Sequence, residues 1–177
     1  MRIIGGKLRG IRLNPPHNLP VRPTTDLAKE ALFNILGQYI DLEEAACLDL
    51  CSGTGNISLE LASRGALSVD SVDIHYKCLA YQREVQQKHG LNNIHVQRSD
   101  IFKFISGCTK QYDFIFTDPP YDLEGLPQLA SLIFERNMVN EGGLLVIEHP
   151  STRKMHEHPN FVELRKYGYS SFSFYQN

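Results

Sequence analysis

The sequence predicts an α/β fold in which helices cover both faces of a mostly parallel, doubly wound sheet. From residue 45 onward, short apolar runs typical of buried strands alternate with longer segments of helical periodicity. Such alternation implies right-handed crossovers between parallel strands. The last two segments, 161–167 and 169–175, alternate in polarity on either side of Gly168. They predict a C-terminal antiparallel hairpin.

Length and composition favour one domain. The chain has 177 residues, of which 42% are hydrophobic and 21% charged, as in ordinary globular proteins. It shows no signal peptide and no apolar run of about 18 residues, so we expect a cytoplasmic protein without a membrane partner. The predicted domain, 1–177, consists of a basic hairpin and linker (1–20), a helix region (21–44) and a core (45–177).

The N-terminal region differs from the rest in charge. Residues 2–13 alternate weakly around a glycine pair and predict a β-hairpin. A helix follows, capped by Thr25 or Asp26 and ended by Gly37. The first 25 residues contain no acid, although the whole chain has a net charge of −2, which indicates a basic arm on an acidic body. A solvated hairpin without function is the alternative. The basic residues are Arg2, Lys7, Arg9, Arg12 and Arg22.

The core elements follow in a regular order. Gly65 and Gly90 end two of the predicted helices, and Gly142-Gly143 precedes the fifth strand. The predicted strands before the hairpin are 46–50, 67–73, 94–97, 112–117 and 144–147. The predicted helices are 56–64, 75–89, a short one around Phe102 and Ile105, and 126–136.

Asp118-Pro119-Pro120-Tyr121, directly after the strand at 112–117, is the clearest chemical motif. Two prolines restrict the backbone, which predicts a rigid turn holding Asp118 at the carboxyl end of a strand. Ligands bind at this edge in open α/β sheets. Asp118 and a proline carbonyl can accept hydrogen bonds from a planar exocyclic amine, and Tyr121 can stack on the attached ring. The motif predicts group transfer to such an amine, with a plain proline-rich turn as the alternative.

A second set of residues predicts a nucleoside cofactor. The loop at 51–55 contains Gly53 and Gly55, which allow close approach of a ligand before a helix N-terminus. Asp49, Asp73 and Asp100 stand at the ends of three successive strands. Asp73 lies near the spacing of about 20 residues expected for a ribose-binding acid. Each acid alone could be a cap or a solvated residue. The expected cofactor residues are Asp49, Cys51, Ser52, Gly53, Thr54, Gly55, Asp73, Ile74, Asp100 and Ile101.

The same loop distinguishes between nucleoside cofactors. A dinucleotide motif needs a third glycine, and this chain has Ser58 at that position. S-adenosyl-L-methionine has a ribose, an adenine and an ammonium group but no phosphate, and Asp49 suits its ammonium. Its methyl group is activated by the sulfonium, so the protein mainly supplies alignment. We therefore expect S-adenosyl-L-methionine as the cofactor. Asp118, Pro119, Pro120 and Tyr121 would form the methyl-acceptor site.

The cysteines and histidines show no metal-ligand spacing. Cys47, Cys51, Cys78 and Cys108 form no C-x-x-C pair. We expect reduced thiols and no metal site.

The chain resembles the RsmD family of bacterial ribosomal RNA methyltransferases over nearly its whole length. The most specific blocks are Arg2-Ile-Ile-Gly-Gly-Lys and Arg22-Pro-Thr. The other matching blocks are Glu30 to Leu36, Asp49-Leu through Gly53-Thr-Gly55, Ser63-Arg-Gly-Ala66, Asp118 to Tyr121, Gly142-Gly143 and Lys166-Tyr-Gly168. The family usually has Phe, Ala and Gly where this chain has Cys51, Ser52 and Ser58, and more often Glu at Asp73.

The resemblance implies a Rossmann-like class I methyltransferase fold with a mostly parallel seven-stranded sheet. It implies methylation of the exocyclic N2 of a guanine in small-subunit (16S) ribosomal RNA. The modest net charge favours an assembled or assembling subunit as the partner, and a monomer is the default expectation. The resemblance places Arg22 and Thr24 near the cofactor, and Arg2, Lys7, Arg9 and Arg12 against RNA phosphate. DNA adenine-N6 methylation and a catalytically silent cofactor-binding module are the alternatives.

Overall fold

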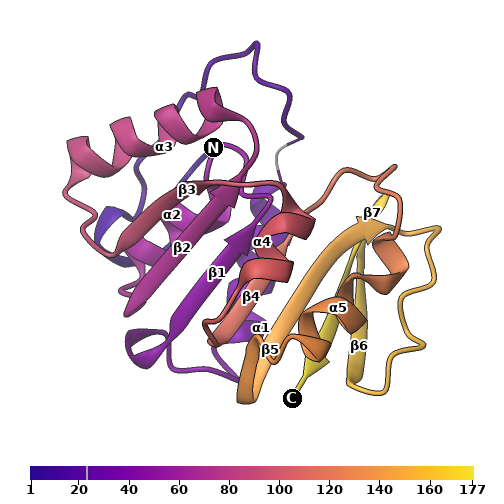
Figure 1. Ribbon diagram of the computed structural model, residues 1–177. Helices are drawn as coiled ribbons and strands as arrows, with labels where there is room; N and C mark the ends of the chain where they lie inside the picture. The colour runs from indigo at the N-terminus through magenta and orange to yellow at the C-terminus, as the bar shows by residue number, and fades with distance from the viewer. Residues whose placement is uncertain (23) are drawn as a thin grey trace.

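The computed structural model describes residues 1–22 and 24–177 and contains one seven-stranded sheet in the order β3-β2-β1-β4-β5-β7-β6. Strands β1 to β5 are parallel to one another, and β7 runs antiparallel between β5 and β6. This confirms the predicted fold class (Figure 1). The strands are β1 (Ala46–Leu50), β2 (Ser68–Asp73), β3 (Ile94–Arg98), β4 (Tyr112–Thr117), β5 (Val139–Pro150), β6 (Phe161–Tyr167) and β7 (Ser170–Gln176).

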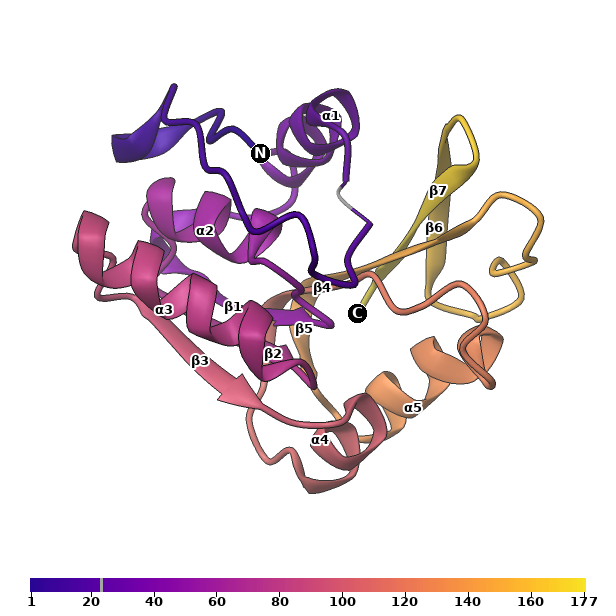
Figure 2. The same cartoon turned by 90° about the horizontal axis from the view of Figure 1, so that it is seen from above.

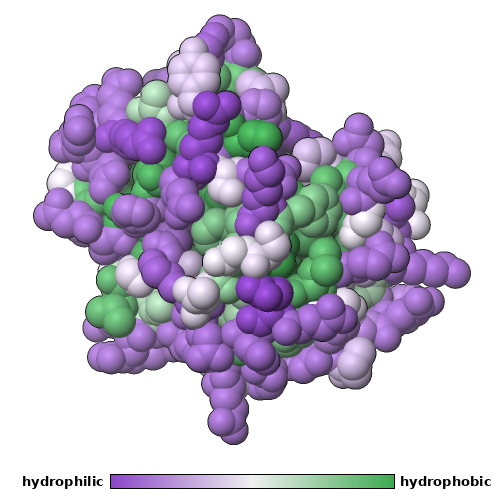
Figure 3. Space-filling view, viewed as in Figure 1, coloured by the Kyte–Doolittle hydropathy of each residue, from purple (hydrophilic) through white to green (hydrophobic). Residues whose placement is uncertain are grey.

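Helices cover both faces of the sheet, as Figure 2 shows from above. On one face lie α1 (Asp26–Leu36), α2 (Asn56–Ser63) and α3 (Tyr76–His89), and on the other lie α4 (Ile101–Gly107) and α5 (Leu129–Glu135). The outward-facing side chains in Figure 3 are mostly hydrophilic, with apolar side chains visible around α4.

Alternation along the buried strands divides the core between the two faces. In β4, Phe114 and Phe116 pack with α1 and α2, whereas Ile115 between them packs with α4 and α5. Parallel strands buried on both sides need such continuous apolar runs. This explains why 112–117 was predictable to the residue.

Only the base of the predicted N-terminal β-hairpin forms, with one antiparallel bridge between Arg2 and Arg12 and backbone hydrogen bonds from Ile3 to Ile11 (2.9 Å) and from Leu13 to Met1 (2.8 Å). Gly6–Leu8 instead forms a short 3₁₀ turn, and the Leu8 N–H donates to the Ser63 hydroxyl at 3.0 Å. Side chains of α2 therefore satisfy backbone groups that a hairpin would have paired.

The carboxylate of Glu60 holds the N-terminal segment onto α2. It is fully buried and accepts hydrogen bonds from the backbone N–H groups of Ile4 (3.0 Å) and Gly5 (2.8 Å). It also pairs with Lys29 of α1 at 3.1 Å and with Arg64 at 2.8 Å. Burial lowers the pKa of Lys29, although Glu60 opposes this shift. A buried charge pair of this kind fixes the position of the N-terminal segment and α1 relative to α2.

Candidate active site

The register of the sheet aligns the ends of four parallel strands. Leu50 of β1 pairs with Val72 of β2 and with Thr117 of β4, and Thr117 pairs with Ile147 of β5. The residues that follow these positions therefore meet at one edge of the sheet. They are Cys51, Asp73, Asp118 and Glu148.

A cavity of about 350 Å³ opens at this edge. Its lining includes every residue that the sequence predicted for the cofactor except Gly55. It also includes Asp118, Pro119 and Pro120, but not Tyr121. Pocket volumes of about 300–1,000 Å³ are typical for small ligands. The structure thus brings the two predicted sets of residues to one cavity.

The glycine loop has the backbone conformations that its sequence suggests. Gly53 and Gly55 have φ values of +56° and +84°, in the left-handed region that favours glycine. Gly55 is the N-cap residue of α2, and a Cβ atom at this position would lie 2.8 Å from Cγ of Gln82. Gly55 therefore shapes the loop from behind rather than lining the cavity. Cys51 has φ +67°, a costly conformation for a residue with a side chain.

A buried chain of hydrogen bonds leads from the Asp49 carboxylate to the glycine loop, and the sequence did not predict it. Its Oδ2 accepts hydrogen bonds from the N–H (2.9 Å) and hydroxyl (2.6 Å) of Ser58. The Ser58 hydroxyl contacts that of Ser71 at 2.7 Å, and the Ser71 hydroxyl donates to Oε1 of Gln82 at 2.6 Å. Nε2 of Gln82 donates to the Gly53 carbonyl at 2.7 Å. The network joins Asp49 to the glycine loop, and burial raises the pKa of Asp49 to about 7.

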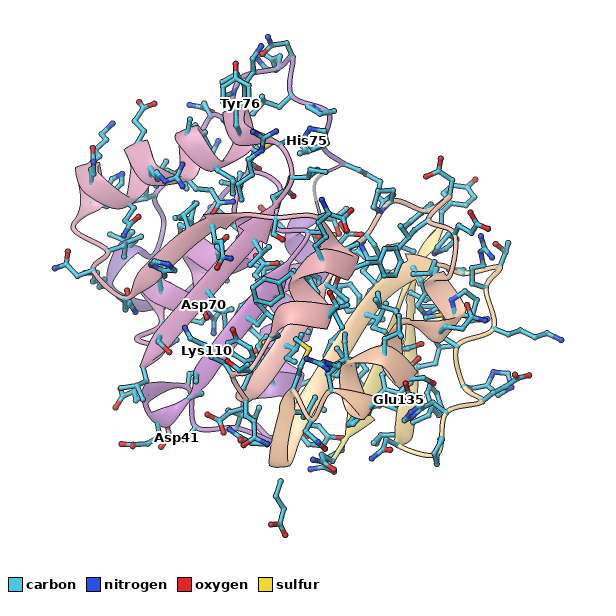
Figure 4. All side chains as sticks on the ribbon, in the orientation of Figure 1. Asp41, Asp70, His75, Tyr76, Lys110 and Glu135 are labelled. Atoms are coloured by element: carbon cyan, nitrogen blue, oxygen red, sulfur yellow. The ribbon has the colours of Figure 1, made fainter. Side chains whose placement is uncertain are left out.

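Asp73 and Asp100 are held by backbone groups and keep capacity for a ligand. Asp73 accepts the Gly53 N–H on Oδ2 and the His75 N–H on Oδ1, both at 2.8 Å. A carboxylate has about four acceptor sites, so one on each oxygen remains. Oδ1 of Asp100 caps α4 by accepting the N–H groups of Phe102 and Lys103. Asp100 is thus both a helix cap and a cavity residue. His75 and Tyr76 start α3 at the top of Figure 4.

A second acid, Glu148, stands beside Asp118 and was not predicted. It is 2% exposed, and its Oε2 accepts a hydrogen bond from the Thr24 hydroxyl at 3.0 Å. Arg22 donates to Oδ1 of Asp118 at 2.9 Å and lies 3.9 Å from Oε1 of Glu148. Arg22 and Thr24 thus lie at the cavity as expected, and Glu148 holds both. Residues this far apart in sequence give no local signal of their contact.

Burial and the neighbouring carboxylate both raise the pKa of Asp118, and Arg22 opposes them. Burial also raises the pKa of Glu148, against the hydrogen bond from Thr24. Two close acids cannot both ionise freely, so the Arg22 guanidinium stabilises the ionised form of the pair.

Tyr121 lies at the mouth of the acceptor site under Arg22. The guanidinium carbon of Arg22 is 3.4 Å from the centre of the Tyr121 ring, a cation–π contact. Arg22 therefore covers both the Asp118 carboxylate and the face of the Tyr121 ring in this structure.

Known proteins match this chain along nearly its full length. The family model described as "Conserved hypothetical protein 95" matches residues 1–176. A relative from Buchnera aphidicola subsp. Baizongia pistaciae, named ribosomal RNA small subunit methyltransferase D, is 32% identical over 94% of this chain and 85% of its own. The protein of that name from Escherichia coli K12 is 30% identical over 84% of this chain and 74% of its own. The chain belongs to this family.

A solved structure supports the same assignment. The putative methyltransferase yhhF from Escherichia coli superposes with a TM-score of 0.87 at 27% identity, covering 99% of this chain and 97% of its own. The resemblance to the RsmD family is thus confirmed.

The family blocks at the N-terminus occupy two different places. In Arg22-Pro-Thr, the outer two residues line the cavity, and Pro23 lies outside the described residues. Arg2 pairs with Asp26 at the start of α1 (3.4 Å) and forms the bridge with Arg12. The Lys7 ammonium instead donates a hydrogen bond to the Gly90 carbonyl at the far end of α3 (3.2 Å), and Arg9 lies two residues later in the chain. Lys7 and Arg9 are therefore not brought to the cavity.

The departures from the usual family loop have visible structural consequences. Ser58, where the family usually has glycine, supplies two hydrogen bonds to Asp49. Ser52 accepts a hydrogen bond from Nε2 of Gln82 at 2.9 Å. The two serines thus join Asp49, Gln82 and the glycine loop in the polar network under the cavity.

Two further observations concern metal ligands and membrane-spanning helices. Within residues 1–22 and 24–177, no three His, Cys, Asp or Glu side chains gather as a metal site would require. None of the helices that the structure describes has the length and apolar character needed to cross a membrane.

Proposed function

We propose that this chain is an S-adenosyl-L-methionine-dependent methyltransferase that modifies the exocyclic N2 amine of a guanine in small-subunit ribosomal RNA. The observation that carries the proposal is the juxtaposition of Asp118-Pro119-Pro120 with the glycine loop and acids of the same cavity. Family membership supports rRNA as the substrate, and the choice of guanine rests on the family alone.

The chemistry of the cavity fits the cofactor. Four carboxylates line it, those of Asp49, Asp73, Asp100 and Asp118, and Arg22 is the one Lys or Arg among the described lining residues. A diphosphate would meet like charge there, whereas a cationic ammonium and two ribose hydroxyls would meet acceptors. Asp49 would hold the ammonium, Asp73 the ribose and Asp100 the adenine amine, on the carboxylate positions left free by the backbone. When bound, the cofactor supplies an activated methyl group.

The acceptor residues would align the amine and receive its charge. Asp118 and the carbonyl of Pro119 or Pro120 would accept hydrogen bonds from the NH2 group, and Tyr121 would stack on the base. As nitrogen gains the methyl group it becomes positive, and the ionised Asp118 carboxylate stabilises that charge. Proton loss can follow later, so Asp118 need not be a strong base. The Arg22 guanidinium must move away from Asp118 when a base enters. Glu148 lies next to Arg22 and is its second carboxylate partner.

We further propose that residues 1–177 act as one methyltransferase domain, as a monomer, in the cytoplasm. The single sheet and a family match over residues 1–176 support one domain. The net charge of −2 favours an assembled or assembling small subunit over protein-free rRNA, because ribosomal proteins could then add contacts.

The test is transfer of labelled methyl groups to unmodified small subunits, protein-free rRNA and unmethylated DNA in parallel. Labelled N2-methylguanine from the subunits is the expected result. Labelled N6-methyladenine in DNA would instead establish the DNA methyltransferase alternative. Cofactor binding without transfer to any of the three would establish a silent binding module.

A further inference from the structure

The turn between β6 and β7 lies beside the proposed acceptor site. Ser170, the first residue of β7, pairs with Pro150 at the end of β5, and Phe172 pairs with Glu148. Gly168 and Tyr169 therefore project just beyond the sheet edge that carries Asp118 and Glu148. In Figure 2 this turn lies on the opposite side of α1 from the N-terminal segment.

Tyr169 is exposed to an unusual degree. Its relative exposure is 94%, the highest among the exposed large hydrophobic residues that the structure describes. Gly168, at the first position of the two-residue turn, has φ +65°, as tight hairpin turns of this kind require. The Tyr169 ring therefore buries almost no surface when the chain folds. The tight turn nevertheless fixes the position from which the ring projects into solvent.

The turn is fixed by the loop that follows β5. The Ser151 N–H donates to the Tyr169 carbonyl at 2.9 Å, and the Ser151 hydroxyl donates to the Gly168 carbonyl at 3.2 Å. At the base of the turn, the rings of Tyr167 and Phe172 lie 5.3 Å apart. The aromatic ring is thus presented from a preorganised support, which lowers the entropy cost of binding.

The segments next to this turn carry exposed basic side chains. Arg153 and Lys154 are exposed in the loop after β5, and Lys166 is exposed in β6. Neither 150–154 nor 165–171 contains an acid, although acids outnumber Lys and Arg in the chain as a whole. We define the residues 151–154 and 166–169 as the tip surface.

We infer that the tip surface binds the single-stranded RNA segment flanking the target nucleotide, with Tyr169 stacking on a base and Arg153 and Lys154 contacting phosphates. Exposed aromatic rings beside cations are the usual means of holding unpaired RNA. The inference rests on the proposed function for the position of the target base. It assigns RNA contact beside the acceptor site to the C-terminal hairpin, since Lys7 and Arg9 lie at the far end of α2 and α3.

The test compares equilibrium binding of small ribosomal subunits and methylation kinetics for Tyr169→Ala and Tyr169→Phe. Stacking of one base is worth about 1–3 kcal/mol, so Tyr169→Ala should weaken binding and raise KM on the order of tenfold. Tyr169→Phe keeps the ring and should stay within about twofold of wild type. At saturating substrate, kcat should not change, and neither should cofactor affinity.

Salt dependence tests the basic residues separately. Removing one phosphate-binding cation should reduce the slope of log affinity against log salt by about 0.7 for single strands, so the slope for the Arg153→Ala/Lys154→Ala variant should fall by about 1.4. Lys110→Ala is the control, because Lys110 pairs with Asp70 (3.0 Å) towards the other end of the sheet (Figure 4). Its slope should equal that of wild type.

Several outcomes overturn this inference. Wild-type affinity in Tyr169→Ala, or equal losses in Tyr169→Ala and Tyr169→Phe, would exclude stacking at the tip surface. A wild-type chain that binds subunits through Tyr169 but transfers no methyl group would refute the proposed function and the position next to a target base, whereas RNA binding by the tip surface would stand. A wild-type chain that neither binds nor methylates would refute both.

Discussion

Replacing Asp118 by alanine should separate catalysis from stability. The substitution removes the carboxylate that we place against the acceptor amine. A preorganised group that stabilises transition-state charge is worth about 2.7–4 kcal/mol, or 10²–10³ in kcat. We therefore expect Asp118→Ala to lower the rate of methyl transfer by about that factor. Asp118→Asn retains one acceptor oxygen and should recover part of the loss.

The folded state should tolerate the same change. The Arg22 side chain is 46% exposed, so its ion pair with Asp118 contributes at most about 1 kcal/mol. Removing Asp118 also removes the charge repulsion between its carboxylate and that of Glu148, which raises the pKa of Asp118 in the wild type. These effects oppose each other, and we expect the melting temperature to stay within a few degrees of wild type.

The assay is single-turnover transfer of labelled methyl groups to small subunits at saturating cofactor, with cofactor affinity and thermal unfolding measured on the same preparations. The reasoning fails if Asp118→Ala, folded and binding cofactor, keeps a rate within threefold of wild type. It also fails if the rate falls only because the cofactor no longer binds.

Three further changes test other parts of the structure. Because burial raises the pKa of Asp49 from 3.8 to about 7, the folded state should lose stability as the pH rises between these two values. Affinity for a cationic cofactor should increase as the pH rises through 7 and Asp49 ionises; calorimetric titration with S-adenosylhomocysteine from pH 5.5 to 8 checks this, and a flat profile contradicts it. Glu60→Gln leaves the Lys29 charge buried without its partner and should cost about 3–5 kcal/mol in chemical denaturation, whereas an unchanged denaturation midpoint would disprove this role. Gly55→Ala forces a left-handed residue against Gln82 and should cost at least about 1–2 kcal/mol and weaken cofactor binding; a fully stable variant would be inconsistent with the geometry.

Local patterns determined how much of the fold was predictable. The strands at 46–50 and 112–117 begin and end where the sequence predicts, because the glycine loop follows the first and the Asp118-Pro119-Pro120 turn follows the second. The fifth strand is longer than predicted and starts at Val139, because Gly142-Gly143 forms an irregularity within the strand and does not interrupt it. The glycine pair alone does not distinguish these outcomes.

The candidate site was predictable where one strand end carries the chemistry, as for Asp73 and Asp118. It was not predictable where contacts join distant segments. Glu148 meets Thr24 only after the sheet has formed, and Ser58 reaches Asp49 only through the packing of α2 on β1. Lys7 and Arg9 share a charge pattern with Arg22, but the 3₁₀ turn carries them away from the cavity. Charge spacing in sequence does not reveal this separation.

The most direct test of the account is the nucleoside composition of small-subunit rRNA from cells that lack the gene for this chain. We expect one N2-methylguanine to be absent by mass spectrometry. Expression of the wild-type chain should restore it, whereas Asp118→Ala should not. An unchanged N2-methylguanine content in the deletion strain, or full restoration by Asp118→Ala, would contradict the proposed reaction or its acceptor site.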